Sequence, residues 1–232
     1  MSTLLLRLAG PMQAWGTDSK FEVRGAGREP SKSGVIGLLA AALGRSRDSD
    51  LSDLNALRFG IRVEQEGVLL RDYHTVCVTE KPYVTNRYYL ADACFLVGLE
   101  GETSFLEQLS DALTNPVFPL FLGRRSCPPC QPLVLGIRNK NLIAALSDEP
   151  WQASEYMQKK LRGRADNAAL RIRVDAPDGS SASKIRDTAI SFDPRRRRYG
   201  YRNVIELNVT ASQKSSPMEC YSAEHDPMEE LR

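Results

Sequence analysis

The order of the apolar segments constrains the fold of this chain more than any other feature of its sequence. Residues 3–9 form a short, almost continuous apolar run that ends at Gly10-Pro11, which is typical of a strand covered on both faces. Residues 33–43 then have helical spacing, with serine residues at their start and Gly44 as a stop signal. The chain is therefore predicted to begin with a central strand followed by a helix.

The segments that follow continue this alternation. The sequence predicts a short helix at 51–57, a strand at 59–63, an extended stretch at 68–78, an apolar strand at 94–99, a helix at 103–113 and another extended stretch at 117–122. The order strand, helix, strand, strand, helix, strand indicates an α+β protein with a split βαβ, ferredoxin-like (RRM-like) βαββαβ domain that carries insertions.

The chain divides into three parts at this level. Residues 1–130 are expected to form the ferredoxin-like domain, with a protruding hairpin inserted at about 79–92 and a long glycine-rich loop at 16–30. Residues 131–210 carry weaker signals, mostly of strands, and are expected to form a smaller C-terminal module. Residues 211–232 are polar and rich in carboxylates, so a flexible acidic tail is expected there.

Composition limits the compartment and the chemistry. The 232 residues contain no apolar stretch of the roughly 18 to 20 residues that span a bilayer, and the five cysteines are an odd number, which suits a reducing compartment. We therefore expect a cytoplasmic protein with free thiols and no cofactor. Cys127 and Cys130 form a Cys-x-x-Cys pair, but without a second pair a zinc site or a redox centre is the lesser alternative.

Two basic segments are suited to phosphate binding. Arg124 and Arg125 follow Gly123, so two guanidinium groups stand on a flexible loop, although a solvated turn would have the same composition. Arg195, Arg196, Arg197 and Arg198 precede Tyr199 and Tyr201, and cations mixed with aromatic rings can hold phosphates and stack on bases. An exposed charge cluster without a ligand is the plain alternative for this run.

Two further segments leave alternatives open. Lys32, Gly34 and Gly37 lie in the first turns of the predicted helix, where a phosphate could approach the free N–H groups, or where the glycines could simply allow close packing. Asp72, Tyr73 and His74 place a carboxylate, a phenol and an imidazole together, so acid–base chemistry is conceivable, although a lone histidine is more often structural.

Four blocks, at residues 6–16, 30–37, 70–76 and 122–128, resemble the CasD family of subunits from type I-E CRISPR Cascade. The last hundred residues contain no comparable block. The resemblance implies a non-catalytic, repeat-associated RNA-binding protein that caps the 5′ handle of the crRNA. It also implies a thumb-like hairpin, for which 79–92 is the candidate, and contacts with a backbone subunit (CasC-like) and a large subunit (CasA-like) that reads the motif flanking the target DNA.

The resemblance also implies RNA-binding residues, each within a matching block: Met12, Gln13, Trp15, Lys32, Ser33, Tyr73, His74, Arg124, Arg125 and Ser126. Arg87 and the run from Arg195 to Arg198 are added from charge alone. The alternative function is that of a metal-independent endoribonuclease acting on CRISPR repeat RNA, as in type I-C relatives. Tyr73, His74 and Lys32 would then be the candidate catalytic residues.

Overall fold

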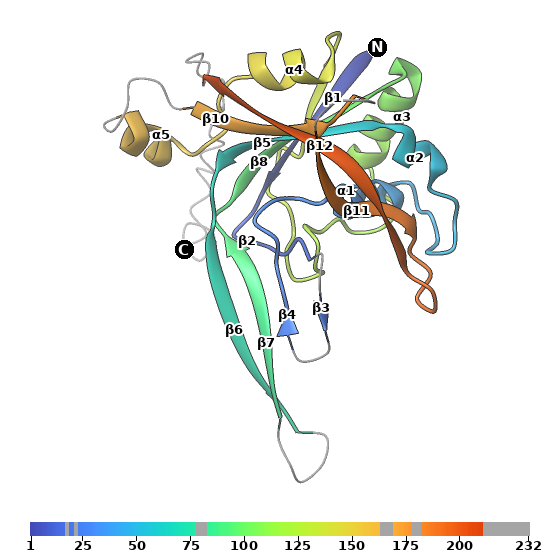
Figure 1. The fold of residues 1–232 in the computed structure, drawn as a ribbon, viewed down its shortest axis with the longest axis vertical. Helices are drawn as coiled ribbons and strands as arrows, with labels where there is room; N and C mark the ends of the chain where they lie inside the picture. Colours follow the sequence, from blue (N-terminus) through green and yellow to red (C-terminus); the bar gives the residue numbers. More distant parts are fainter. Residues whose placement is uncertain (17–18, 21–22, 78–82, 163–168, 178–181, 211–232) are drawn as a thin grey trace, which may run out of the picture.

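The computed structural model describes residues 1–16, 19–20, 23–77, 83–162, 169–177 and 182–210, and the protein has a mixed α/β fold built on two sheets (Figure 1). The larger sheet is antiparallel and runs in the order β11 (Ser183–Ser191), β12 (Arg198–Thr210), β10 (Ala169–Asp175), β5 (Arg58–Gln65), β8 (Cys94–Gly101), β1 (Ser2–Ala9) and β9 (Val134–Arg138). The smaller sheet runs in the order β2 (Met12–Gln13), β7 (Tyr83–Ala91), β4 (Val23–Arg24) and β3 (Ser19–Lys20), with β6 (Val68–Val76) paired to β7. The helices are α1 (Lys32–Ala42), α2 (Ser52–Ala56), α3 (Thr103–Thr114), α4 (Leu142–Asp148) and α5 (Glu155–Arg162).

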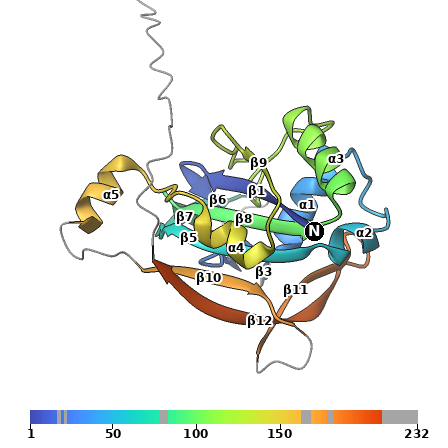
Figure 2. The same ribbon diagram turned by 90° about the horizontal axis from the view of Figure 1, so that it is seen from above.

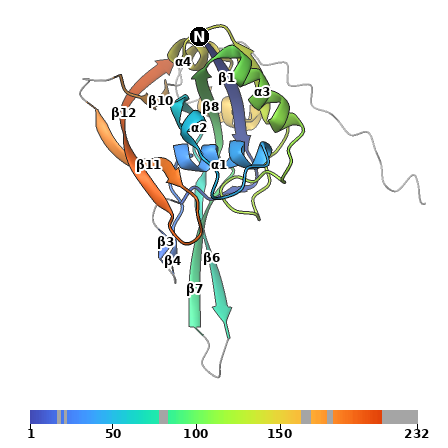
Figure 3. The same ribbon diagram turned by 90° about the vertical axis from the view of Figure 1, so that its right-hand side faces the viewer.

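Strand β1 is covered on both faces, as its continuous apolar run predicted. Successive side chains of a strand point to opposite faces, and Leu4, Leu6 and Leu8 accordingly enter the main core with α1 and α3, whereas Leu5 packs against α4. Figure 3 shows α1 and α3 on the near side of the sheet, and Figure 2 shows α4 over β5 and β8. Hydrophobic burial from both sides thus fixes the position of β1 in the sheet.

The helix predicted at 33–43 is confirmed as α1. Its N-cap is Ser31, whose Oγ accepts a hydrogen bond of 3.1 Å from the backbone N–H of Gly34. A Cβ atom added to Gly34 would lie 2.8 Å from the ring of Trp15, so only glycine allows that ring to reach the helix. The first turn of α1 is therefore built for close aromatic packing.

The strand expected at 117–122 is not found among the described residues, and the correction has a local reason. Pro116 and Pro119 have no backbone N–H to give to a sheet. The strand beside β1 is instead β9, which was expected at 133–137 but within the C-terminal module.

Strands β10 to β12 extend the same sheet through pairing of β10 with β5, so the sheet runs across the boundary expected at residue 130. The predicted tail, 211–232, lies outside the described residues.

The expected hairpin is longer than the predicted range of 79–92. β6 and β7 pair along their whole length from Val68 opposite Ala91 to Val76 opposite Tyr83, so the stretch 68–78 is one arm of the hairpin. Residues 78–82 lie outside the described residues. The hairpin projects from the body in Figure 1, and most of β6 is exposed on both of its faces.

Several elements were not predicted, although the longer helices were. Helix α4, strand β11 and the short strands β3 and β4 within the segment 16–30 lack the length or the periodicity that sequence patterns need. Helix α5 begins four residues later than the helix expected from residue 151. None of the helices within the described residues is long and apolar enough to cross a membrane.

Candidate nucleic-acid interface

One face of β7 gathers several of the predicted residues. Thr85, Arg87 and Tyr89 alternate along the strand and therefore share a face. In the antiparallel pairing Asp72 lies opposite Arg87 and His74 opposite Thr85, so both residues of β6 share this face as well. We call Thr85, Arg87 and Tyr89, together with the Arg124 side chain that covers Tyr89, the β7 face.

Arg124 reaches the β7 face from its loop. Its guanidinium carbon lies 4.7 Å from the centre of the Tyr89 ring, and its Nη2 donates to the carbonyl oxygens of Arg24 at 3.0 Å and Gly25 at 3.3 Å. The loop is held here by Gly123, which has φ +86 and whose missing Cβ would lie 2.0 Å from the Ala14 carbonyl oxygen. Backbone geometry that only glycine tolerates thus sets the position of Arg124.

Three polar atoms on the β7 face are buried without a hydrogen-bond partner among the described residues. They are Thr85 Oγ1, Arg87 Nε and Arg124 Nη1. Two of them belong to guanidinium groups, and leaving a charged donor buried and unsatisfied costs more than leaving a neutral one. Phosphate oxygens accept hydrogen bonds from both N–H and O–H donors, so each of these atoms is of a type that a phosphate can pair with.

Gln13 and Trp15 do not fit their predicted role. Both side chains are buried: Gln13 Nε2 donates to the Leu8 and Ala93 carbonyl oxygens at 3.1 and 2.8 Å, and Trp15 Nε1 donates to Gln13 Oε1 at 2.8 Å. These bonds use the polar atoms inside the protein, so direct contact with RNA is not supported for either residue. Met12 differs, because it is partly exposed and lies opposite Ala91, on the side of Tyr89.

Lys32 and Ser33 are also turned inward. Lys32 Nζ donates to the Leu57 carbonyl oxygen at 2.9 Å and forms an ion pair with Asp175 Oδ2 at 3.0 Å. The backbone N–H of Lys32 donates to Asp187 Oδ2 at 2.9 Å, so a protein carboxylate already occupies the N-terminus of α1. The Ser33 side chain is buried with its Oγ 3.3 Å from that of Ser31. The expected phosphate contact at this helix is therefore replaced by internal pairing.

The candidate catalytic set is not assembled. His74 Nε2 lies 2.5 Å from Asp72 Oδ2 on the exposed β6 strand, whereas Tyr73 points to the opposite face of that strand. Lys32 is enclosed in its ion pair with Asp175. The three groups therefore do not converge on one reacting atom.

The remaining predicted residues are exposed. Arg125 and Ser126 stand in the loop beside Arg124, and Arg195, Arg196, Arg197 and Arg198 are all exposed where β11 turns into β12. The side chains of these four arginines form no ion pair with a described residue. Their guanidinium groups are accessible to phosphates.

The described cysteines include both members of the Cys-x-x-Cys pair. Cys127 is buried and Cys130 is exposed, and both are free thiols. Burial raises the pKa of Cys127, and burial raises the pKa of Cys94 to about 12. In the described part of the chain no three histidine, cysteine or carboxylate side chains are grouped to hold a metal ion.

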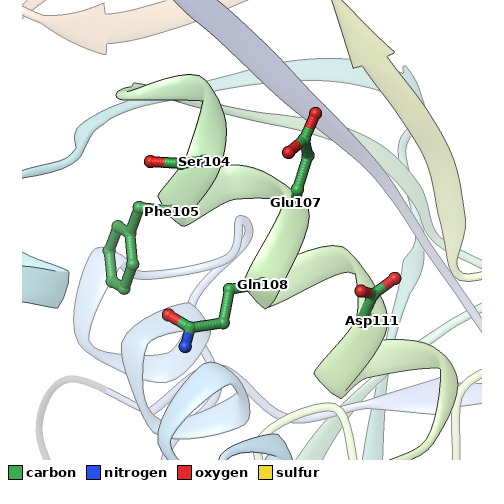
Figure 4. A pocket seen from close by; sticks show the side chains of 5 residues that line it. All are labelled: Ser104, Phe105, Glu107, Gln108 and Asp111. Carbon is green, nitrogen blue, oxygen red and sulfur yellow. The ribbon is translucent and has the colours of Figure 1, made fainter.

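A shallow pocket on the outer side of α3 is of the wrong charge for RNA. Ser104, Phe105, Glu107, Gln108 and Asp111 line it, and Figure 4 shows the side chains of Glu107 and Asp111 along the same helix. Two carboxylates would repel a phosphate backbone. The β7 face and the exposed arginines are therefore the better candidate interface.

Sequence reasoning missed Thr85 and Tyr89 of the β7 face, and it missed Arg24, whose carbonyl oxygen accepts a hydrogen bond from Arg124. The segment was expected to be a hairpin at about 79–92, and placing a strand at 83–91 within it would have brought Thr85, Arg87 and Tyr89 onto one face by their alternation. No sequence signal indicated that Arg124 would lie over Tyr89, because the two residues are far apart in the chain.

Comparisons with known proteins cover most of the chain. Residues 3–205 match the model of a family described as CRISPR-associated protein (Cas_Cas5). The chain is 39% identical over 189 residues to the "CRISPR system Cascade subunit CasD" of Escherichia coli (strain K12), which covers 70% of this chain and 84% of that protein. The structure resembles a chain of a "CRISPR RNA-guided surveillance complex" with a TM-score of 0.75 and 31% identity over 90% of each chain. It also resembles a "Cas protein" crystal structure with a TM-score of 0.70 and 40% identity, over 91% of this chain and 96% of that one. The similarity includes the C-terminal strands, where no matching block had been identified.

Proposed function

The chain belongs to the CRISPR-associated Cas5 family, and from this premise we propose that it is a non-catalytic subunit of a Cascade-type surveillance complex that binds the 5′ handle of the crRNA. Its partners would be the guide RNA, a backbone subunit and a large subunit, with target DNA reached through the complex. Its place of action would be the cytoplasm.

The observation that carries RNA binding is the set of unsatisfied donors on the β7 face. Arg87 Nε, Arg124 Nη1 and Thr85 Oγ1 are already buried and lack acceptors within the described residues, so much of the cost of desolvating them is borne by the free protein. A phosphate placed there would gain charge-assisted hydrogen bonds from two guanidinium groups. Arg125 and Ser126, exposed in the next loop, would extend the contact along the RNA backbone.

We also infer that the body is a ferredoxin-like unit and that the β6–β7 hairpin is its thumb. The order β9-β1-β8-β5 with antiparallel neighbours, and helices α1 and α3 in the two crossovers, supports the first inference. The projection of a long two-stranded ribbon from the body supports the second (Figure 1).

The test is a titration of the purified chain with labelled handle RNA at several salt concentrations. We expect Arg87→Gln combined with Arg124→Gln to weaken binding and to lower the salt slope by about 0.7 for each lost phosphate contact on a single strand. Replacing Arg124 and Arg125 together should lower the slope in the same way.

The matched control is Arg71→Gln. Arg71 is exposed on β6 opposite Tyr88, so it carries the same charge on the other face of the same hairpin. Its replacement should leave affinity and slope almost unchanged. Equal losses from both faces would show that only the general charge of the hairpin matters, and no loss from either would remove the β7 face from the RNA site.

The endoribonuclease alternative rests on the hydrogen bond between His74 and Asp72, which could orient an imidazole. Incubating the chain with repeat RNA in a chelator distinguishes the two functions. Bound but intact RNA supports the proposal, whereas specific cleavage that disappears in His74→Ala would replace it with a nuclease.

A further inference from the structure

The hairpin formed by β11 and β12, residues 183–202, has an exposed outer surface that is strongly cationic. Its exposed cations are Lys184, Arg186, Arg195, Arg196, Arg197 and Arg198. Of the two carboxylates of the hairpin, Asp187 pairs with Arg202, and Asp193, whose Oδ1 accepts the backbone N–H of Arg195 at 2.8 Å, leaves a single negative charge against these six cations. The outer surface of this arginine hairpin is therefore not neutralised from within, and Tyr201, 68% exposed, lies beside it.

On its inner side, the same hairpin is joined to α1 by hydrogen bonds and ion pairs. Asp187 accepts the backbone N–H of Lys32 at 2.9 Å and the Arg202 guanidinium at 2.6 and 3.0 Å. Arg202 also donates to Asp175 Oδ1 at 2.6 Å, and Asp175 Oδ2 in turn pairs with Lys32. We call these four residues the inner quartet. It links the first turn of α1 to β10, β11 and β12.

A second attachment lies one helical turn further along α1. An added Cβ at Gly37 would lie 3.7 Å from the Phe192 ring, so this ring packs on the bare helix surface just before the arginine run begins. Asn55 adds a hydrogen bond of 2.6 Å from its Nδ2 to the Ala189 carbonyl oxygen. The turn itself is ordered by the bonds from Arg195 and Arg196 to Asp193.

We propose that the arginine hairpin is a preorganised arm that binds phosphates of the guide RNA, and that Lys32 and Gly37 are positioning residues that hold this arm and do not touch RNA. The proposal rests on the proposed function. A loop of like charges left mobile would have to be ordered on binding, and fixing it beforehand removes that cost. Figures 1 and 3 show β11–β12, β3–β4 and β6–β7 projecting at the same end of the molecule, so one RNA strand could contact the β7 face and the arm together.

The test compares two substitutions at one helix position. Gly37→Ala adds a Cβ at ordinary contact distance from Phe192, whereas Gly37→Gln adds a longer side chain that continues beyond that Cβ, which we expect to displace the ring. Both residues are good helix formers, so helix propensity is matched. Each variant is titrated with handle RNA, alone and together with replacement of Arg195 to Arg198 by Gln.

We expect the arginine replacement to weaken binding by about tenfold or more and to lower the salt slope. In the otherwise unaltered chain, Gly37→Gln should cause part of this loss of RNA affinity, and Gly37→Ala should cause almost none. In the chain whose four arginines are already replaced, Gly37→Gln should cause no further loss. Hydrogen exchange should increase in β11 and β12 of Gly37→Gln but not in β1 or β8.

The outcomes separate this proposal from the function on which it rests. If the unaltered chain does not bind the RNA, the proposed function fails. If replacing Arg87 and Arg124 weakens RNA binding but replacing the four arginines does not, only the proposed role of the arginine hairpin is rejected. Additive losses of affinity from Gly37→Gln and the arginine replacement would overturn the positioning role. A residue that acts only through the arginine hairpin should have no effect on affinity once the four arginines are replaced.

Discussion

Arg198 and Arg202 stand four residues apart on β12, yet they occupy opposite environments. The Arg202 side chain is 9% exposed, lies between Asp175 and Asp187, and covers the Phe59 ring at 5.0 Å. Arg198 is exposed and continues the run that begins at Arg195. The same residue type thus holds the fold together at one point and presents an unpaired charge at the other, and the difference is made by carboxylates from other strands.

The largest effect on stability is expected from a substitution in the inner quartet. Asp187→Ala should lower the free energy of unfolding by about 3–5 kcal/mol, because it leaves Arg202 buried with one of its partners missing and removes the acceptor at the start of α1. Urea unfolding followed by circular dichroism measures this loss. A loss below about 1 kcal/mol would mean that the inner quartet behaves like a surface pair.

A partly exposed ion pair provides the next comparison. Arg45 and Asp53 have side chains 24% and 42% exposed, and their bond of 2.7 Å should contribute only about 0.2–1 kcal/mol, which Asp53→Ala would remove. The hydrogen bond from Arg45 lowers the pKa of Asp53, so the contribution is present above the unfolded-state pKa and is lost as the pH falls through the folded-state pKa. Unfolding curves of the two proteins should therefore converge in acid, and a difference that persists there would exclude the ion pair as its cause.

The outer arginines should contribute least to stability. Replacing Arg195 to Arg198 by Gln should change the free energy of unfolding by no more than about 0.5 kcal/mol, because their side chains make no ion pair with a described residue. Thermal unfolding of the free protein measures this. A large destabilisation would show that the run supports the fold, and the contrast with Arg202 would then disappear.

Strong local patterns predicted the central part of the fold. The apolar run of β1 and the capped helix α1 need only their own residues to be recognised, and both were found where expected. The fourth strand of the body was misplaced because residues 117–122 are apolar enough for a strand, but Pro119 within the segment and Pro116 just before it have no backbone N–H to give to a sheet. β9 takes the edge beside β1 instead.

The structure places the residues predicted for the candidate site in two different environments. Arg87 was chosen from its charge alone and Arg124 from its charge and a motif block, and the two lie on one face, with His74 nearby and Arg125 in the adjoining loop. Gln13, Trp15 and Lys32 were chosen from motif blocks, and the structure buries all three. A motif can mark residues that are needed for packing as readily as residues that touch a ligand.

By itself, the sequence determined the central strand, the first helix, the resemblance to a family of RNA-guided complexes and the presence of two arginine-rich segments. Only the tertiary structure decided which charges face outward. Whether a lysine or an arginine meets solvent or a carboxylate depends on residues brought from distant strands, as Asp175 and Asp187 are brought to Lys32. Local sequence carries no record of those neighbours, and the desolvation that makes such pairs structural arises only when the chain is folded.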